Sequence, residues 1–303
     1  MPKHLHSDIT PKVSVVIPSF NCADYLPRAI DSILSQTMDD IEIIVVDDGS
    51  TDPTRQVMER YSTLPMVRYL YQENGGVGRA RNAGAQASRG HYVAFIDADD
   101  ALPQNALEKL CAALHAEPGA CWCITDIWKV RENGQELQRS NVPSRDPFYG
   151  ILEDDFVRRG IFFRREDFLA VGMYDESLKS REDWDINIRM LESGRAFCYI
   201  PEPLYLYSWR SGSLMTSPSG KVLFHTDRLL RKHHKRLADA GDRRAAQIYA
   251  KNMWDLGRRY FYSRRDLFRA LGCIRESLAY DLSFARLFHP LFYNVKRLAG
   301  RTL

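Results

Sequence analysis

Three carboxylates stand within four residues, at Asp97, Asp99 and Asp100, directly after the apolar run 92–96. An apolar run of this length between polar residues predicts a buried β-strand. Carboxylates crowded at a strand end repel one another unless a cation or hydrogen-bond donors neutralise them. One interpretation is a site for Mg²⁺ or Mn²⁺, because these ions bind one or two carboxylates and complete their shell with phosphate and water. The alternative is a turn in which the aspartates cap a helix that begins near Pro103.

Two earlier strand ends favour the cation interpretation. The β-branched run 13–17 leads into Ser19, and the run 41–46 leads into Asp48. The carboxyl ends of parallel strands meet at one edge of a sheet, and ligands of α/β sheets bind at that edge. We therefore expect the three polar strand ends to converge on one crevice that binds a metal ion and phosphate.

The elements that would position this crevice alternate between strands and helices, a rhythm that predicts a mostly parallel α/β sheet flanked by helices. The predicted strands are 13–17, 41–46, 66–71 and 92–96, and the predicted helices are 24–36, one that begins near Pro53, 76–87 and 103–115. Beyond residue 120 the pattern changes, and residues 140–160 are predicted to be irregular. The further predicted strands are 120–130, 161–163, 197–200 and 204–209, and the further helices are 165–171 and 180–193.

Length and composition indicate a folded chain. The 303 residues are 45% hydrophobic, which is enough for a full core. The first twelve residues are polar and no apolar run approaches ~20 residues, so we expect neither a secretory signal nor a spanning helix. The six cysteines lack the spacing of zinc ligands, so the expected compartment is the reducing cytoplasm.

Charge and pattern both change near residue 217. Residues 221–303 hold 19 of the 42 Lys and Arg residues but only 7 of the 39 Asp and Glu residues. Helical patterns replace strands over the same stretch, so we predict a domain at 1–217 and a basic helical module at 218–303. The module lacks nucleic-acid-binding motifs, so nucleic acid is not an expected partner.

The end of this module permits two interpretations. Residues 284–298 repeat apolar side chains at helical spacing among basic ones, which suits an interfacial helix on an anionic membrane leaflet. A helix that packs on the first domain with a basic outer face fits the same pattern. The first interpretation predicts a protein held peripherally on the inner face of the cytoplasmic membrane.

Six short blocks now resemble a known family in their order and spacing. They are Val-Ser-Val-Val-Ile-Pro-Ser-Phe-Asn at 13–21, Val-Val-Asp-Asp-Gly-Ser-Thr-Asp at 45–52, Asn-Gly-Gly-Val-Gly at 74–78 leading to Ala-Arg-Asn at 80–82, Asp-Ala-Asp-Asp at 97–100, Gly-Met-Tyr-Asp-Glu at 172–176 and Glu-Asp-Trp-Asp at 182–185. Over about residues 12–215 the chain is similar to the family-2 glycosyltransferases of the GT-A fold. The resemblance implies a GT-A-like, Rossmann-type sheet. It also implies inverting transfer of a hexosyl or N-acetylhexosaminyl group from a nucleotide diphosphate, with UDP favoured, in bacterial surface-polysaccharide biosynthesis.

The resemblance also implies roles for individual residues. Asp99 would bind a divalent metal ion, Mn²⁺ or Mg²⁺, between the donor phosphates, and Asp97 would hold the ribose or a metal-bound water. Asp183 matches the catalytic base, which takes the proton of the acceptor hydroxyl as its oxygen attacks the anomeric carbon. The positions that match nucleotide-sugar contacts are Pro18, Ser19, Asn21, Asp48, Arg81, Asn82, Asp97, Asp99 and Arg210. Glu182, Trp184 and Trp209 are expected on the acceptor side, although large aromatics are more often part of a core.

One position departs from the family pattern. Arg210 stands where the family often has His after its late strand. Arginine is always charged and cannot bind a metal ion. Either the metal ion has fewer protein ligands here, or Arg210 contacts the diphosphate directly.

Other functions fit part of the pattern. Nucleotidyl transfer would need a Gly- and Arg-rich loop after the first strand, where this chain has Pro18-Ser19. A protein that only binds nucleotide sugars would not need Asp183. Transfer to a polyprenyl phosphate stays open beside transfer to a hydroxyl of a glycan or lipid-linked glycan, because a phosphate acceptor needs no base.

Overall fold

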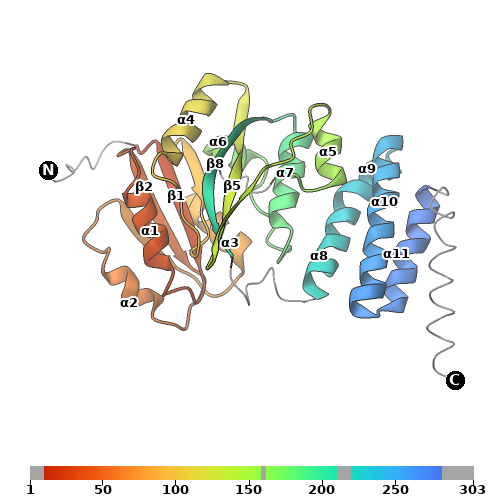
Figure 1. Ribbon diagram of the computed structural model, residues 1–303, viewed down its shortest axis with the longest axis horizontal. Coiled ribbons are helices and arrows are strands. Elements are labelled where there is room, and N and C mark those ends of the chain that lie inside the picture. Colours follow the sequence, from red (N-terminus) through yellow and green to blue (C-terminus); the bar gives the residue numbers. More distant parts are fainter. Residues whose placement is uncertain (1–9, 158–161, 210–219, 282–303) are drawn as a thin grey trace. The chain divides into compact units, whose positions relative to one another are not determined.

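The computed structural model describes residues 10–157, 162–209 and 220–281 (Figure 1). The chain divides into two compact units. Unit 1 comprises residues 1–151 and 155–218, and unit 2 comprises residues 152–154 and 219–303. No helix among the described residues is long and apolar enough to span a bilayer.

Unit 1 is built on a mixed eight-stranded sheet with the order β3-β2-β1-β4-β7-β5-β6, and β8 pairs with β5. The strands are β1 (Val13–Ser19), β2 (Ile41–Asp47), β3 (Val67–Tyr71), β4 (Tyr92–Phe95), β5 (Ala120–Arg131), β6 (Gly134–Gln138), β7 (Phe162–Arg164) and β8 (Ala196–Ser208). The first four strands are parallel, and the short β7 joins β4 to β5 in antiparallel pairing. The predicted α/β sheet flanked by helices is confirmed.

The register brings the polar strand ends to one edge of the sheet. Ser19 lies opposite Asp47 in the β1–β2 pair. On the other side of β1, the Ile96 N–H donates to the Val16 carbonyl at 3.0 Å. The carboxylate run that follows Ile96 therefore leaves the sheet at the edge where β1 and β2 end.

Helices in unit 1 follow the strands: α1 follows β1, as Figure 1 shows, and α3 follows β3. At Gly84 of α3 an added Cβ would lie 2.3 Å from Val16 Cγ1 on β1, so this glycine allows the helix to approach the sheet closely. The helices are α1 (Leu26–Leu34), α2 (Thr54–Glu59), α3 (Val77–Ala87), α4 (Ala106–Ala116), α5 (Pro147–Glu153), α6 (Arg165–Ala170) and α7 (Glu182–Glu192).

Two details of the predicted elements are wrong. Residues 140–160 contain the helix α5, which is too short for its apolar residues to produce a helical period. The two strands predicted at 197–200 and 204–209 are one strand, β8, although it contains Pro201 and Pro203. β8 has a full partner, β5, on one side only, so prolines can be accommodated without loss of ladder hydrogen bonds on the other side.

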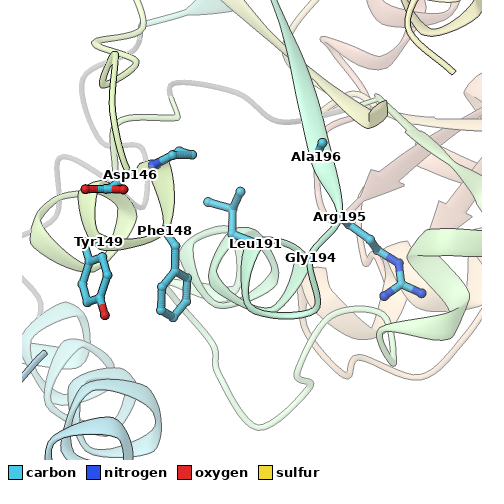
Figure 2. Close-up of a pocket in the computed structure, with 8 residues that line it drawn as sticks. Asp146, Phe148, Tyr149, Leu191, Gly194, Arg195 and Ala196 are labelled. Atoms are coloured by element: carbon cyan, nitrogen blue, oxygen red, sulfur yellow. The ribbon is translucent and has the colours of Figure 1, made fainter. Parts of the chain in front are cut away.

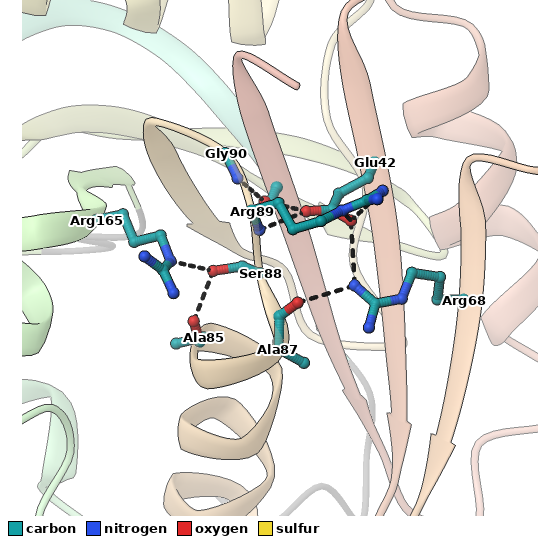
Figure 3. A network of polar contacts seen from close by, with 9 residues as sticks. Glu42, Arg68, Ala85, Ala87, Ser88, Arg89, Gly90 and Arg165 are labelled. Carbon is teal, nitrogen blue, oxygen red and sulfur yellow. Dashed lines mark hydrogen bonds and ion pairs between the residues drawn. The ribbon is translucent and has the colours of Figure 1, made fainter. Parts of the chain in front are cut away.

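The opposite edge of the sheet is tied together by a buried carboxylate, Glu42 (Figure 3). Ser14 Oγ and the Arg89 N–H donate to Glu42 Oε1, each at 2.7 Å. Arg68 donates to Glu42 Oε2 at 3.3 Å and to the Ala87 carbonyl at 2.8 Å. The network joins β1, β2, β3 and the turn after α3 far from the carboxylate run, so we assign it to stability.

Unit 2 is helical. It contains α8 (Gly220–Leu230), the π-helix η1 (Arg231–Lys235), α9 (Arg236–Asp239), α10 (Arg243–Arg259), the π-helix η2 (Tyr260–Arg264) and α11 (Leu267–Tyr280). Asp242 and Asp266 cap α10 and α11 by accepting from Ala245 N and Arg269 N. The predicted interfacial segment 284–298 lies outside the described residues.

Candidate active site

The carboxylate run after β4 forms a compact cluster. One carboxylate oxygen of each of Asp97, Asp99 and Asp100 lies within 4.8 Å of the others. Asp100 is 1% exposed, and its two oxygens accept from the Tyr205 hydroxyl at 2.6 Å and the Ser208 N–H at 2.7 Å. The same Tyr205 oxygen accepts from the Asp97 N–H at 3.3 Å. Strand β8 therefore fixes the shape of the cluster.

The cluster fits a hard divalent cation. Its donor atoms are all carboxylate oxygens, which Mg²⁺ and Mn²⁺ prefer. Asp100 is held by β8, whereas Asp97 and Asp99 are partly exposed. Metal binding by Asp99, with Asp97 beside it, stays a prediction.

Arg81 of α3 links this cluster to the first turn of α7. Its Nη2 donates to Asp97 Oδ1 at 2.7 Å, and its Nη1 donates to Asp183 Oδ1 at 3.0 Å and to Glu182 Oε1 at 3.2 Å. The Arg81 side chain is 6% exposed, whereas the Asp183 side chain is 41% exposed. The predicted base therefore faces solvent while its partner guanidinium is buried.

Charge and burial together determine the protonation of Arg81 and Glu182. Burial alone would lower the pKa of Arg81, but the charges of Asp183 and Asp97 outweigh it and hold the pKa well above its ordinary value. Burial, followed by the charge of Asp183, raises the pKa of Glu182 to about 7. Arg81 thus stays charged at every pH at which the protein is folded, and Glu182 titrates near neutrality.

Asn82 holds the segment that leads into α7. Its Nδ2 donates to the Tyr174 carbonyl at 2.9 Å, and its Oδ1 accepts from the Tyr174 N–H at 2.9 Å. The buried Tyr174 ring lies 5.2 Å below the Arg81 guanidinium. Arg81 and Asn82 are both engaged by protein groups in this structure, and the donor contacts expected of them stay predictions.

Asp48 organises the glycine turn before α3. Its Oδ1 accepts from Gln72 Nε2 at 2.6 Å and from the Gly75 N–H at 2.8 Å, and its Oδ2 accepts from the Gly76 N–H at 2.7 Å. Lys179, from the loop before α7, donates to the Gly75 carbonyl. Asp48 is 3% exposed, so this buried carboxylate shapes the turn; its contact with a nucleotide stays a prediction.

The loops after β1 and β2 are joined to each other. Asn21, which adopts a positive φ of 52°, accepts from the Thr51 N–H at 2.8 Å and donates its own N–H to Ser50 Oγ at 3.0 Å. Pro18 and Ser19 lie at the end of β1, and Ser19 is buried. These contacts hold the loop after β1 against the loop after β2, and the nucleotide contacts expected of Pro18, Ser19 and Asn21 stay predictions.

The predicted aromatic residues lie in different surroundings. Trp184 is buried, and its Nε1 donates to the Ile151 carbonyl at 2.6 Å, so its ring lies in the interior of unit 1. Trp209 is partly exposed beyond the end of β8, with Lys129 Nζ 3.6 Å from the ring centroid. Sugar stacking by either ring stays a prediction, and Arg210 lies outside the described residues.

Tyr205, Tyr174 and Lys179 shape this site but were not identified from the sequence. Tyr205 lies in an ordinary alternating strand pattern, and Lys179 lies in a polar loop, so neither has a local signal that distinguishes it. Tyr174 stands inside one of the family-like blocks, which is the only sequence signal that could have drawn attention to it.

A cavity of about 290 Å³ lies between α5 and the connection from α7 to β8 (Figure 2). Phe148 and Tyr149 project from α5, Leu191 lies near the end of α7, and Arg195 directly precedes β8. None of the predicted site residues lines this cavity, so it is separate from the carboxylate cluster.

Comparison with known sequences identifies the family to which the chain is similar. The family described as "Glycosyl transferase family 2" matches residues 14–172. Chondroitin synthase of Escherichia coli is 33% identical over 189 residues, which cover 61% of this chain and 27% of that protein. Glycosyltransferase GlyA of Streptococcus pneumoniae serotype 4 is 40% identical over 219 residues, which cover 67% of this chain and 31% of that protein. The chain thus spans about a quarter to a third of the length of these two relatives.

Solved structures resemble the chain over most of its length. Residues 1–349 of TarS of S. aureus, in complex with UDP-GlcNAc, match with a TM-score of 0.68 and 22% identity. The match covers 88% of this chain and 81% of that one. The complex of the same TarS fragment with UDP matches with a TM-score of 0.63. At this identity the likeness establishes the fold alone.

Proposed function

The chain belongs to glycosyl transferase family 2 and has the GT-A fold, and from this premise we propose that it transfers a sugar from a UDP-sugar to a hydroxyl of a glycan or lipid-linked glycan. The transferred group is a hexosyl or N-acetylhexosaminyl group, and the anomeric configuration inverts. Two solved structures of one TarS fragment, in complex with UDP-GlcNAc and with UDP, support the choice of nucleotide.

The observation that carries the proposal is the bridge through Arg81. A single guanidinium contacts Asp97 at 2.7 Å and Asp183 at 3.0 Å. This arrangement supports a donor diphosphate on the Asp97 side and an acceptor on the Asp183 side. Because Arg81 neutralises Asp183 electrostatically without covering it, the exposed carboxylate stays available to accept the proton of an acceptor hydroxyl.

A divalent cation belongs to the proposal. Asp99 and Asp97 would hold it, and when bound it would offset the negative charge that develops on the departing diphosphate. The protein would bind the nucleotide with the walls formed by Pro18, Ser19 and Asn21 and by the Asp48 turn, together with Asn82 and Arg210. Arg81 would hold Asp97 and Asp183 in place beside the donor. Glu182 and Trp209 would serve the acceptor side. We further propose a cytoplasmic location, held peripherally on the inner face of the membrane.

Calorimetry tests the donor half of this proposal. The full chain is titrated with UDP, GDP and dTDP, each with Mn²⁺ and with EDTA. We expect tight binding of UDP only with the metal ion, and its loss in Asp99→Ala but not in the control Glu117→Ala, whose exposed side chain lies at the end of α4. Absence of binding by every nucleotide would refute the transferase proposal.

Turnover tests the acceptor half. UDP release is measured with glycan, lipid-linked glycan and polyprenyl phosphate acceptors. Asp183→Asn should lower transfer to a hydroxyl by about 10²–10⁴-fold while UDP affinity is retained. If Asp183→Asn retains turnover with polyprenyl phosphate, the acceptor is a phosphate and Asp183 is not a base.

A further inference from the structure

Helix α11 of unit 2 carries both buried and exposed apolar side chains. Its inward side is settled by contacts with α10, where an added Cβ at Gly257 would lie 3.1 Å from Ile274 Cγ1 and 3.3 Å from Cys273 Cβ. Ala270, Cys273 and Ile274 are buried on this side. A helix with one buried face normally places polar residues on its other face. The outward surface of the first turn of α11 does not follow this rule.

Three apolar residues gather at the start of the outward face, and we call them the α11 patch: Leu267, Phe268 and Leu271. Leu267 and Leu271 are each 51% exposed, and Phe268 is 89% exposed. Spacings of three and four residues make them neighbours on one helical surface. Tyr262 of η2, in the turn that joins α10 to α11, is also exposed, at 55%. A cluster of this kind usually contacts something apolar.

The surroundings of the patch are strongly basic. Residues 257–272 contain five arginines and one carboxylate, Asp266. Arg258, Arg259, Arg265 and Arg269 are exposed. Two of these arginines pair with exposed or half-exposed carboxylates, Arg258 with Asp255 at 3.7 Å and Arg269 with Asp266 at 3.5 Å, so the segment keeps an excess of positive charge. Exposed aliphatic and aromatic side chains with arginines close by in the sequence are suited to a surface that is apolar below and negatively charged above. An acidic protein partner would match the arginines but would not by itself bury Phe268 in an apolar medium.

We propose that the turn between α10 and α11 docks on an anionic lipid bilayer, with the α11 patch inserted among the acyl chains and the surrounding arginines on the lipid phosphates. The inference deepens the membrane partner proposed above and gives it a defined surface. It needs neither donor nor acceptor, so it is tested separately from the transferase activity.

The experiment is flotation of the full chain with vesicles, in the absence of nucleotide. Vesicles of phosphatidylcholine are compared with vesicles that contain about one third phosphatidylglycerol. We expect binding to the anionic vesicles that weakens as salt rises. Phe268→Ser should lower the partition coefficient by about tenfold or more, and Arg258→Gln with Arg259→Gln by about fivefold per arginine. The control is Leu137→Ser on β6, an exposed leucine of unit 1 that should leave binding unchanged.

Two further measurements distinguish membrane docking from contacts between copies and from packing within the chain. Light scattering and thermal unfolding are recorded for the parent and Phe268→Ser, and both should be unchanged because the side chain is exposed. Failure of the parent to float, or equal flotation of Phe268→Ser, overturns the proposal. A lower mass for Phe268→Ser assigns the patch to a contact between copies, and a clearly lower unfolding temperature assigns it to packing within the chain; either result also overturns the proposal. UDP binding by these variants is measured separately, so a failure to bind vesicles leaves the donor-site conclusion standing.

Discussion

Arg81→Lys tests whether Arg81 acts through the carboxylates around it. The structure gives its two Nη atoms three partners: Asp97, Glu182 and Asp183. A lysine ammonium is a single point charge and cannot reproduce the planar fork that spans these carboxylates. We therefore expect the substitution to loosen the first turn of α7 from the end of β4.

The magnitude follows from burial. Removing one partner of a fully buried ion pair costs about 3–5 kcal/mol. The side chains of Glu182, Asp97 and Asp183 are 10%, 26% and 41% exposed, so solvent screens the last of them and its share is small. Lysine also retains the charge. We expect a loss of about 2–4 kcal/mol, which corresponds to roughly 5–15 °C in Tm for a unit of this size.

The assay combines thermal unfolding with UDP calorimetry. Arg131→Lys serves as the control, because Arg131 and Glu136 form an exposed ion pair at 3.3 Å and its loss should cost no more than about 1 kcal/mol. If Arg81 positions Asp183, Arg81→Lys lowers Tm and turnover while UDP affinity falls little. An unchanged Tm with a large loss of UDP affinity would refute this reasoning and would indicate that Arg81 contacts the donor directly.

Three further substitutions probe unit 1. Burial, followed by the charge of Asp183, raises the pKa of Glu182 from 4.5 to about 7. The folded state is therefore more stable at low pH, where this carboxyl is protonated, and that stability is lost as the pH rises through about 7. Glu182→Gln should therefore gain stability relative to the parent across this window, and a pH-independent difference in urea midpoint would contradict the assignment. Burial alone would raise the pKa of Glu42, but hydrogen bonds from Ser14 and the Arg89 N–H outweigh it and lower that pKa. The ionised Glu42 therefore stabilises the fold at pH values above the ordinary carboxyl pKa, and this stabilisation is lost on acidification. Glu42→Gln should cost about 2–4 kcal/mol at neutral pH, and the difference should shrink below about pH 4, by the same measurement. Gly84→Ala should cost about 1–3 kcal/mol through its clash with Val16, whereas Gly272→Ala, with nothing within 4 Å, should not destabilise; equal Tm values for the two variants would contradict the close approach of α3 to β1.

The sequence by itself determined the architecture of unit 1 and the composition of its site. Strand and helix periods are local properties, so β1, β2, β4 and their helices could be predicted within a few residues. The Asp-Ala-Asp-Asp run and the blocks around it are also local, and they identified the family before any contact was known. The register of parallel strands then made convergence at one edge a geometric consequence.

Tertiary structure alone decided how the site is held together. Arg81 could have been a solvated residue of a helical face, and its burial against Asp183 depends on a contact across 102 positions of the chain. Asp100 belongs to the same run as Asp99, but it accepts a hydrogen bond from Tyr205, 105 positions away, which anchors the run to β8. No local period encodes such pairs, because a side chain's partner depends on which segments the completed fold brings within hydrogen-bonding distance. The same holds for the α11 patch, because tertiary contacts decide which apolar residues of α11 pack on α10 and which stay exposed.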